Sequence, residues 1–381
     1  MKTVVMLTSR QTEVPPTKGA AIQTWMHEVC QRLPHYQTHI LSIAHPHLPR
    51  REFRNGVYYH RIHMGRVYRR LFQKITRWDP NGYHRRALRI IQDLRPDIVH
   101  IHNDHETGEL VRQIRRRLPE TRVVLHLHNQ IQAFDRPGYP PVDLCLGCSD
   151  HITEHYRSRI ESPRFETVYN GVDPVRYRET ARLRETGVYR RHPPDTVTVA
   201  CFGRVSPEKG TDQFVELARL CKDDARLRFV CVGEISRHGQ RAALYRQIRA
   251  AIREHKLAHI EFLDVVPQDK MHLAYAQADL VVIPSCFEEP FCMVAIEAMA
   301  VGIPVIAAAK GGMREYLRHG KNALLIENYA DFPQEARQCV YTLVADPELR
   351  VTLTANALRT VQERFTWHHI AARLQTRYDR F

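Results

Sequence analysis

At 381 residues the chain is too long for one typical domain and suits two, each large enough to bury a core. Its nine cysteines are an odd number scattered through apolar runs, and its first apolar run is only strand-length, so the composition excludes a disulfide-stapled secreted protein and favours a cytoplasmic one. The net charge of +14 implies an anionic partner.

Runs of β-branched residues alternate with helical stretches in both halves of the chain. This order is typical of parallel sheets with crossover helices and predicts two doubly wound α/β domains. The predicted strands cover residues 3–8, 38–43, 57–62, 97–102, 122–128, 143–149 and 166–169, then 197–202, 227–232, 260–263, 280–284, 305–308 and 323–326. Ligands of such sheets bind beyond the carboxyl ends of the strands, so we expect a site in a cleft between the two domains.

The loop after the first predicted strand contains Gly19 and Ala20 and leads into a helix. Small residues there permit close backbone approach to a ligand, and the helix N-terminus can donate N–H groups to a phosphate. The loop is not a GxGxxG fingerprint, and the chain has no P-loop and no HExxH motif. Nicotinamide, NTPase and zinc-protease functions therefore have no motif support.

The segment 50–95 carries thirteen Lys or Arg against three Asp or Glu. Within it, residues 66–78 interleave bases with apolar residues at helical spacing, which is the pattern of a basic amphipathic helix. Two interpretations remain open: a helix lying on an anionic membrane surface, or a solvated helix packed by its apolar stripe. No nucleic-acid motif accompanies the charge, so nucleic acid is not expected as a partner.

Two pairs of histidines, His100 with His102 and His126 with His128, alternate on predicted strands, so each pair points to one side of its strand. With 23 histidines in the chain such pairs arise by chance, and no metal site is expected from them. His128 is a candidate ligand contact instead, because it stands at the carboxyl end of its strand.

Asn170 ends the last predicted strand of the first half, in a segment that also has the composition of a simple turn. The stretch 174–195 is rich in arginine and lacks a long apolar run, so we predict that it is the inter-domain linker. Two amphipathic helices are predicted over residues 346–365 and 367–378, where they would cover the sheets or bridge the domains.

Arg204 and Lys209 stand five residues apart in a loop shaped by Gly and Pro that follows the predicted strand 197–202. A guanidinium and an ammonium together can neutralise a diphosphate, the first through its fork and the second as a point charge. A surface turn with two incidental bases is the alternative explanation for this loop.

The most informative stretch is the apolar run 289–309, in which Glu297 is the only charged residue after Glu289. Burying an unpaired carboxylate costs several kcal/mol, so Glu297 needs a protein donor or the polar part of a ligand as its partner. We predict a loop at Glu289, a helix from about 291 to 302, and a buried strand at 305–308.

If both glutamates lay along that helix, about 12 Å would separate them. That spacing exceeds the roughly 5 to 9.5 Å between the carboxylates of a glycoside hydrolase, so an acid/base pair acting on one bond is not expected. Two carboxylates holding opposite ends of one elongated polar ligand fit better. A helix N-terminus between them would favour a phosphate.

Taken together and in this order, these segments resemble a retaining glycosyltransferase of family 4. The resemblance spans essentially the whole chain and is most specific at the paired glutamates and the Arg/Lys loop. It implies the GT-B architecture, with an acceptor-binding domain over residues 1–180, joined by a C-terminal helix over 365–381, and a donor-binding domain over 190–364. The matching segments are 19–20, 128–129, 169–173, 203–210, 289–297, 311–315 and 365–367.

The resemblance also implies a role for each matched residue. Arg204 and Lys209 would hold the donor diphosphate and the leaving group. Glu289 would bind hydroxyls of the donor sugar, Glu297 would bind the ribose hydroxyls, and His128 would lie by the sugar at the reacting centre. The remaining donor-binding residues would be Gly19, Ala20, Asn170, Gly203, Phe291, Cys292, Met293 and, near the base, Val266.

The sequence departs from the family pattern at two of these positions. Ala20 stands where the family has the second glycine of its first loop, which narrows the space for a phosphate or an acceptor. Cys292 stands where the family has a glycine after Glu-Pro-Phe, so the local geometry around the sugar is expected to differ there.

The implied reaction is transfer of a sugar from a nucleotide-sugar, taken as a UDP-sugar, to a hydroxyl of a glycan, glycolipid or other cell-envelope acceptor. No Asp-x-Asp metal motif stands in the cleft segments, so no metal and no cofactor are expected, and Arg204 and Lys209 would stabilise the charge instead. The alternatives are a nucleotide-sugar epimerase of the same architecture and a non-catalytic, membrane-associated nucleotide-sugar-binding protein. The basic segment would place the protein on the inner face of the cell membrane.

Overall fold

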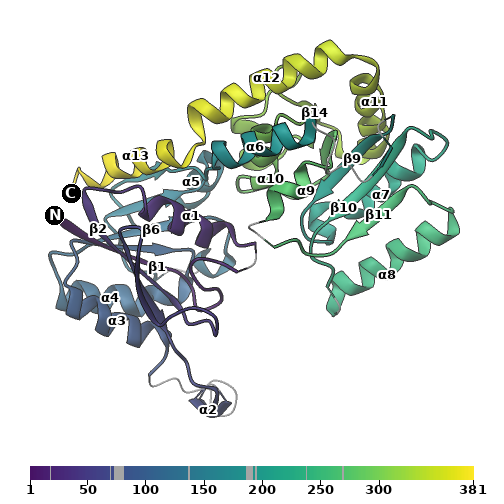
Figure 1. Ribbon diagram of the computed structural model, residues 1–381. Coiled ribbons are helices and arrows are strands. Elements are labelled where there is room, and N and C mark those ends of the chain that lie inside the picture. The colour runs from purple at the N-terminus through teal and green to yellow at the C-terminus, as the bar shows by residue number, and fades with distance from the viewer. Residues whose placement is uncertain are drawn as a thin grey trace. The chain divides into compact units, whose positions relative to one another are not determined.

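The computed structural model describes residues 1–17, 19–68, 70–72, 81–135, 138–185, 192–193, 195–236, 238–267 and 270–381. These residues form two compact α/β units (Figure 1). The N-terminal unit consists of Met1–Asn170 together with Trp367–Phe381, and the C-terminal unit is Gly171–Thr366. The chain thus returns to its first unit for its last fifteen residues.

The described part of the N-terminal unit holds an eight-stranded sheet in the order β3-β4-β2-β1-β5-β6-β7-β8. Its neighbouring strands pair in parallel, except that β3 runs antiparallel to β4. The strands are β1 (Lys2–Leu7), β2 (Tyr36–Ile43), β3 (Arg51–Arg54), β4 (Val57–Ile62), β5 (Ile98–His102), β6 (Arg122–Leu127), β7 (Leu144–Gly147) and β8 (Phe165–Thr167). β3 was not predicted, because three of its four residues are charged and it lies at the exposed edge of the sheet.

Helices cover both faces of this sheet. α1 (Ala21–Cys30) packs against α13 (Trp367–Tyr378), and α3 (Tyr83–Leu94) packs against α4 (Gly108–Arg117), as Figure 1 shows on opposite sides of the strands. The remaining described helices of the unit are α2 (Arg66–Tyr68) and α5 (Asp150–Tyr156). This layering is the doubly wound arrangement that the sequence predicts.

The C-terminal unit contains, within its described residues, a six-stranded parallel sheet in the order β11-β10-β9-β12-β13-β14. The strands are β9 (Val197–Phe202), β10 (Leu227–Val232), β11 (Ile260–Leu263), β12 (Leu280–Ile283), β13 (Val305–Ala308) and β14 (Leu324–Ile326). The strand order reverses between β9 and β12, and such a reversal opens a crevice at the carboxyl ends of the two strands.

Seven helices surround this sheet in the described residues, and α10 is the most deeply placed of them. Seven of its nine residues are buried, because it packs against the sheet, α6 and α12 at once. That position explains why the helix is apolar on every side. The helices are α6 (Pro174–Glu185), α7 (Thr211–Leu220), α8 (Gly239–Glu254), α9 (Met271–Tyr275), α10 (Met293–Val301), α11 (Phe332–Ala345) and α12 (Pro347–Arg364).

The predicted linker needs correction, and most of the predicted basic helix falls outside the described residues. The predicted linker 174–195 begins as a helix, α6, which packs on α9 and α10, while residues 186–191 and 194 lie outside the described part. Of the predicted basic helix 66–78, only α2 and residues 70–72 are described. Among the residues that the structure describes, no helix is long and apolar enough to cross a membrane.

Candidate functional site

The loops that follow β9 and β12 meet at the carboxyl end of the second sheet. Gly210 in the first loop has a φ of 64°, and a Cβ built on it would lie 1.9 Å from the carbonyl oxygen of Pro284 in the second. Only glycine allows this approach. The contact fixes the loop that carries Arg204 and Lys209 directly against the end of β12.

Lys209 and Glu289 form an ion pair in this place. The Lys209 Nζ lies 2.6 Å from the Glu289 Oε1, and the Ser285 hydroxyl donates to the same oxygen at 2.6 Å. Only 3% of Glu289 is exposed, so the ammonium and the hydroxyl replace the water that the carboxylate loses. Burial lowers the pKa of Lys209, but the Glu289 carboxylate more than offsets it, and the pKa lies above its ordinary value.

The backbone of Glu289 is held by the loop after β13. The Gly312 N–H donates to the Glu289 carbonyl at 2.7 Å, and the Gly311 N–H donates to the Glu288 carboxylate. Gly311 has a φ of 54°, and a Cβ on it would lie 2.3 Å from the Glu289 carbonyl oxygen. Three loops of the sheet therefore converge on Glu289.

Arg204 lies beside this ion pair in sequence but faces solvent. Its side chain is 48% exposed and lies 4.0 Å from Glu208 Oε1, a contact that leaves the guanidinium open to a ligand. Gly203, just before it, has a φ of 127°, and a Cβ there would meet no described atom within 4 Å. Both residues thus border open space at the end of β9.

The turn of Phe291, Cys292 and Met293 leads into α10. Cys292 has a φ of 74°, a conformation that side chains rarely adopt, at the position where the family pattern has glycine. The Tyr316 hydroxyl donates to the carbonyl oxygens of Phe291 at 2.5 Å and Cys292 at 3.1 Å and so holds the turn. The glycine-like backbone is retained although the residue is cysteine.

Glu297 lies on α10 and has partners inside the protein. The Tyr275 hydroxyl donates to its Oε2 at 2.8 Å, and the Tyr177 hydroxyl is a second hydrogen-bond partner. Burial raises the pKa of the Glu297 carboxyl to about 7. The sequence left two kinds of partner open for this carboxylate, a protein donor or a ligand, and the structure shows protein donors. α10 begins at Met293, so Glu289 lies before the helix rather than along it.

Val266 follows β11 and is half-buried in a loop where the neighbouring Val265 and Pro267 are exposed. Its backbone is thus close to the surface at the carboxyl end of the same sheet. Residues 268 and 269, which come next, lie outside the described residues.

The candidates of the N-terminal unit gather at the carboxyl end of its own sheet. Ala20 is the N-cap of α1, and Gly19 before it is exposed. His128 directly follows β6, but its ring is only 5% exposed and lies 3.2 Å from His102, Nε2 to Nδ1. Asn170 is buried, and its Oδ1 has no hydrogen-bond partner among the described residues.

A buried cluster of four histidines surrounds the Trp25 ring: His100 and His102 on β5, His126 on β6, and His128 just after β6. Their ring centroids lie 4.8 to 6.2 Å from that of Trp25. Burial lowers the pKa of the His128 imidazole to about 3, so the ring is neutral near pH 7. The nitrogen atoms of His100, His102 and His126 lie within 4.8 Å of one another, as metal ligands would. The rings of His100 and His102 stack with an angle of 12° between their planes.

Sequence reasoning did not identify three residues that complete these sites. Ser285 could have been identified from the sequence, since it is a polar residue directly after a buried strand. Tyr177 and Tyr275 could not, because α6 and α9 come close to Glu297 only through tertiary packing. The structure joins Lys209 to Glu289 and keeps Glu297 in a separate hydrogen-bond group.

Comparison with known proteins decides the family. Residues 190–360 match the family model described as Glycosyl transferases group 1, and residues 22–176 match that of Glycosyltransferase Family 4. A lipopolysaccharide 1,2-N-acetylglucosaminetransferase of Salmonella typhimurium is 30% identical over 98% of this chain and 97% of its own length. The chain belongs to glycosyltransferase family 4.

Another relative matches the chain over almost its whole length, and solved structures share its fold. Spore coat protein SA of Bacillus subtilis is 24% identical to this glycosyltransferase over 99% of both chains. Sucrose-phosphate synthase from Thermosynechococcus elongatus has the same fold, with a TM-score of 0.78 at 19% identity over 100% of this chain and 99% of the other. So does HepE of Anabaena, solved with UDP and glucose, with a TM-score of 0.74 at 17% identity over 99% of each chain.

The predicted GT-B fold is thereby confirmed for this glycosyltransferase, and so is its nature as a transferase enzyme. Of the three functions considered from the sequence, glycosyl transfer is the one that agrees with the family.

Proposed function

We propose that this glycosyltransferase moves a sugar from a UDP-sugar to a hydroxyl group of a glycan, glycolipid or other cell-envelope acceptor, with retention of configuration. The ion pair of Lys209 and Glu289 carries the proposal, because it holds a cation and a carboxylate together at the carboxyl end of the second sheet. The exposed Arg204 adds a second cation nearby in sequence. Support for UDP comes from the Anabaena structures, which were solved with UDP and with UDP-glucose.

Support for the acceptor class comes from relatives. One acts in the transfer of N-acetylglucosamine to lipopolysaccharide, and another, from Rhodococcus jostii, is a D-inositol 3-phosphate glycosyltransferase that is 33% identical over 60% of this chain. Both names describe transfer to a hydroxyl-rich acceptor, the class proposed for this enzyme.

Arg204 and Lys209 are proposed to neutralise the diphosphate as it leaves, since fixed cations cost no reorganisation at the moment of reaction. Glu289 would accept hydrogen bonds from the donor sugar while remaining paired with Lys209. The residues proposed to contact the donor through backbone or small side chains are Gly19, Ala20, Asn170, Gly203, Val266, Phe291, Cys292 and Met293.

Glu297 is proposed to bind the ribose hydroxyls without losing its protein partners. An ionised carboxylate offers about four acceptor positions, and the hydroxyls of Tyr275 and Tyr177 occupy two of them. The other positions remain for the ligand. His128, which is neutral near pH 7, would serve as a hydrogen-bond partner by the sugar and would not act as a charged acid.

The activity test compares Arg204→Ala and Lys209→Ala with the matched variants Arg249→Ala and Lys222→Ala, whose side chains are exposed elsewhere on the same unit. Acceptor-dependent release of nucleoside diphosphate is the readout. We expect the first two variants to lose at least about a hundredfold in turnover and the controls to keep it. Full activity in the Arg204→Ala/Lys209→Ala double variant would overturn the assignment. Thermal-shift screening against nucleoside diphosphates tests the choice of UDP.

Metal independence is part of the proposal, because Arg204 and Lys209 supply the positive charge that a cation supplies elsewhere. We expect an initial rate that EDTA leaves unchanged. A rate that EDTA abolishes and Mg²⁺ or Mn²⁺ restores would show that a metal is required.

We also propose that this enzyme is cytoplasmic and binds the inner face of the membrane through segment 50–95. The basis is the thirteen basic residues in that segment. We expect binding to vesicles that contain phosphatidylglycerol, weakening as salt is raised, and none to phosphatidylcholine vesicles. If the protein binds both kinds of vesicle equally, or binds neither, the segment is a solvated surface and not a membrane-binding one.

A further inference from the structure

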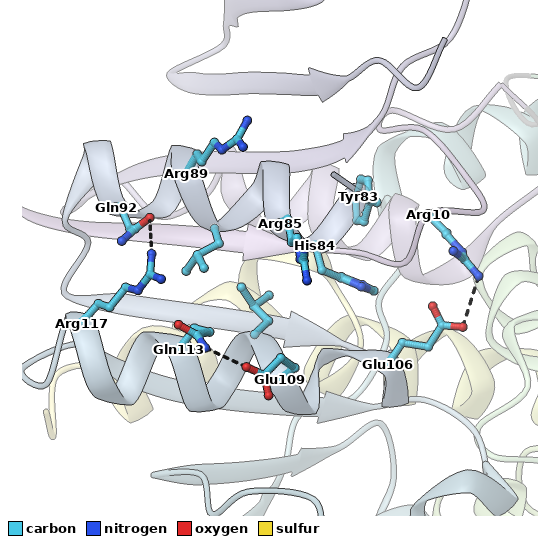
Figure 2. A pocket seen from close by; sticks show the side chains of 13 residues that line it. Arg10, Tyr83, His84, Arg85, Arg89, Gln92, Glu106, Glu109, Gln113 and Arg117 are labelled. Atoms are coloured by element: carbon cyan, nitrogen blue, oxygen red, sulfur yellow. Dashed lines mark hydrogen bonds and ion pairs between the residues drawn. The ribbon is translucent and has the colours of Figure 1, made fainter. Parts of the chain in front are cut away.

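A pocket of about 620 Å³ lies between α3 and α4 of the N-terminal unit, within the size range of sites for small ligands. We propose that this α3–α4 pocket binds an anionic saccharide, one bearing phosphate or carboxylate groups, as the charged part of the acceptor. Its assignment to the acceptor rests on the proposed transferase reaction. Figure 2 shows Arg85 between the two helices, with Gln92 and Arg117 at one end and Arg10 and Glu106 at the other.

The lining of the pocket has an excess of positive charge. Its described residues include four arginines, at positions 10, 85, 89 and 117, and two glutamates, at positions 106 and 109. Arg10 and Glu106 pair at 3.3 Å, but their side chains are 46% and 42% exposed. An ion pair this exposed to water is weak, so a ligand anion can take the place of the glutamate.

The far end of the pocket offers a second cation. The Arg117 Nη1 donates to the Gln92 Oε1 at 3.4 Å, and this neutral amide leaves the charge of the guanidinium uncompensated. Arg85 and Arg89 stand one helical turn apart on α3, and the eight residue-to-residue steps from His84 to Gln92 span about 12 Å. Successive anionic groups on one or two sugars would therefore each meet a guanidinium fork.

The rest of the lining suits a sugar. The floor includes the buried side chains of Leu88 and Leu110, which are 8% and 4% exposed and would pack against the apolar face of a ring. Gln113 donates to Glu109 at 2.7 Å, but its Oε1 is buried with no hydrogen-bond partner among the described residues. An acceptor without a partner is unfavourable, and a hydroxyl of the ligand could supply the missing hydrogen bond.

The pocket also begins where a ligand of this fold is expected. Arg10 follows β1, and Glu106 follows β5, the strand that pairs with β1 in parallel. Carboxyl ends of adjacent parallel strands meet at one edge of the sheet, which is the edge where doubly wound folds bind their ligands. The pocket runs from that edge along the two helices.

Arg115, Arg116 and Arg117 form the last turn of α4, where cations also stabilise the helix dipole. Arg116 is exposed and does not line the pocket, although it shares that turn. Arg116→Gln is therefore the matched control for Arg117→Gln, with equal loss of charge and equal effect on the helix end.

The test measures direct binding by calorimetry at low ionic strength, using glucose 1,6-bisphosphate as the anionic probe and maltose as a neutral one. We expect the first to bind the intact protein, to bind at least about tenfold more weakly to Arg117→Gln, and to bind more weakly still to Arg85→Gln/Arg117→Gln. Arg116→Gln should bind like the unmodified chain, and maltose should bind markedly more weakly than the bisphosphate. Equal binding by the intact protein, Arg117→Gln and Arg116→Gln, or equal binding of both probes, overturns the pocket assignment whether or not transfer activity is found.

A second experiment tests whether the saccharide bound in the α3–α4 pocket is the acceptor of the reaction or a regulator that is not consumed. With paired acceptors that differ only in a phosphate group, we expect the double variant to raise the KM of the phosphorylated acceptor and to leave donor hydrolysis without acceptor unchanged. A phosphorylated saccharide that changes donor hydrolysis without being consumed overturns the acceptor assignment. Binding of anionic vesicles, but not of the bisphosphate, in an Arg85/Arg117-dependent manner shows a membrane surface and likewise overturns it.

Discussion

The ammonium of Lys209 and the carboxylate of Glu289 lie 2.6 Å apart, although eighty residues separate them in the chain. The Ser285 hydroxyl shares the same carboxylate oxygen, and Gly312 fixes the backbone of Glu289. Lys209, Ser285 and Glu289 therefore form one connected cluster at the carboxyl end of the second sheet, and its members should depend on one another energetically.

A double-mutant cycle tests that dependence. We expect Lys209→Met to lower the free energy of unfolding by about 3 kcal/mol, because a buried carboxylate loses its counter-ion. Lys209→Met/Glu289→Leu should recover at least about 1 kcal/mol of that loss, since no unpaired charge then remains. Scanning calorimetry of the four proteins gives the coupling. Strictly additive losses would show that the two groups do not interact.

Glu297 should make the C-terminal unit less stable as the pH rises. Burial raises the pKa of its carboxyl to about 7, against an ordinary value of 4.5. Below pH 4.5 the carboxyl is protonated in both the folded and the unfolded chain, so it does not change the stability. Between pH 4.5 and about 7 the unfolded chain loses this proton while the folded chain keeps it, so the free energy of unfolding falls as the pH rises. The difference corresponds to about 3 kcal/mol.

Glu297→Gln should therefore raise the melting temperature at pH 8 and leave it nearly unchanged at pH 4.5. Glu363→Gln, at an exposed position of the same unit, should shift neither. The same Glu297→Gln substitution should raise the donor KM through loss of the proposed ribose contact. An unchanged donor KM would speak against that contact, and an equal shift at both pH values would speak against the buried charge.

Tyr275→Phe should move the ionisation of Glu297 to higher pH. The Tyr275 hydroxyl donates to the carboxylate and so lowers its pKa against the effect of burial. Without it, the midpoint of the pH dependence of donor binding should rise. Tyr245→Phe, which removes a hydroxyl on α8, serves as the control. Coincident pH profiles for both variants would mean that the hydroxyl does not act through Glu297.

Cys292 tests backbone strain at the start of α10. The φ of 74° at this position favours glycine, so Cys292→Gly should relieve backbone strain. The cysteine side chain is only 7% exposed, so the same substitution also removes packing contacts, and the two effects on stability oppose each other. We expect that variant to stay within about 1 kcal/mol of the unmodified chain. Cys292→Val should lose more than about 2 kcal/mol, because a β-branched side chain tolerates this conformation least. Melting temperatures in the reverse order would contradict the strain.

The histidine cluster should make the N-terminal unit sensitive to acid. Burial lowers the pKa of His100, His102, His126 and His128, to about 3 for His128. Above about pH 6.5 the rings are neutral in both states. Below about pH 6.5 these histidines bind protons in the unfolded chain but stay neutral in the folded chain. The free energy of unfolding therefore decreases as the pH is lowered toward the pKa values of the folded chain.

His102→Gln removes one of these titrating groups and should reduce the loss of melting temperature between pH 7 and pH 5. His368→Gln, at an exposed position on α13, should not reduce it. An identical loss in both variants would mean that the cluster is not the acid-sensitive element.

Much of the fold and the charged part of the site were determined by the sequence alone. Alternation of β-branched runs and helices is a local pattern, and it located all strands except β3, whose charged residues at the sheet edge leave no apolar signal. Arg204, Lys209 and the two glutamates were identifiable because charges in glycine-shaped loops and apolar runs need a chemical reason.

Only the tertiary structure decided which groups these charges meet. The sequence left open whether Glu297 meets a protein donor or a ligand, because Tyr177 and Tyr275 lie on helices distant in sequence, and hydrogen bonds between such elements form only after packing. The same holds for Ser285 beside Glu289, and for the glycine-like backbone of Cys292, which Tyr316 imposes from another loop. Local pattern fixes secondary structure and burial, whereas the pairing of buried polar groups depends on contacts that no local pattern encodes.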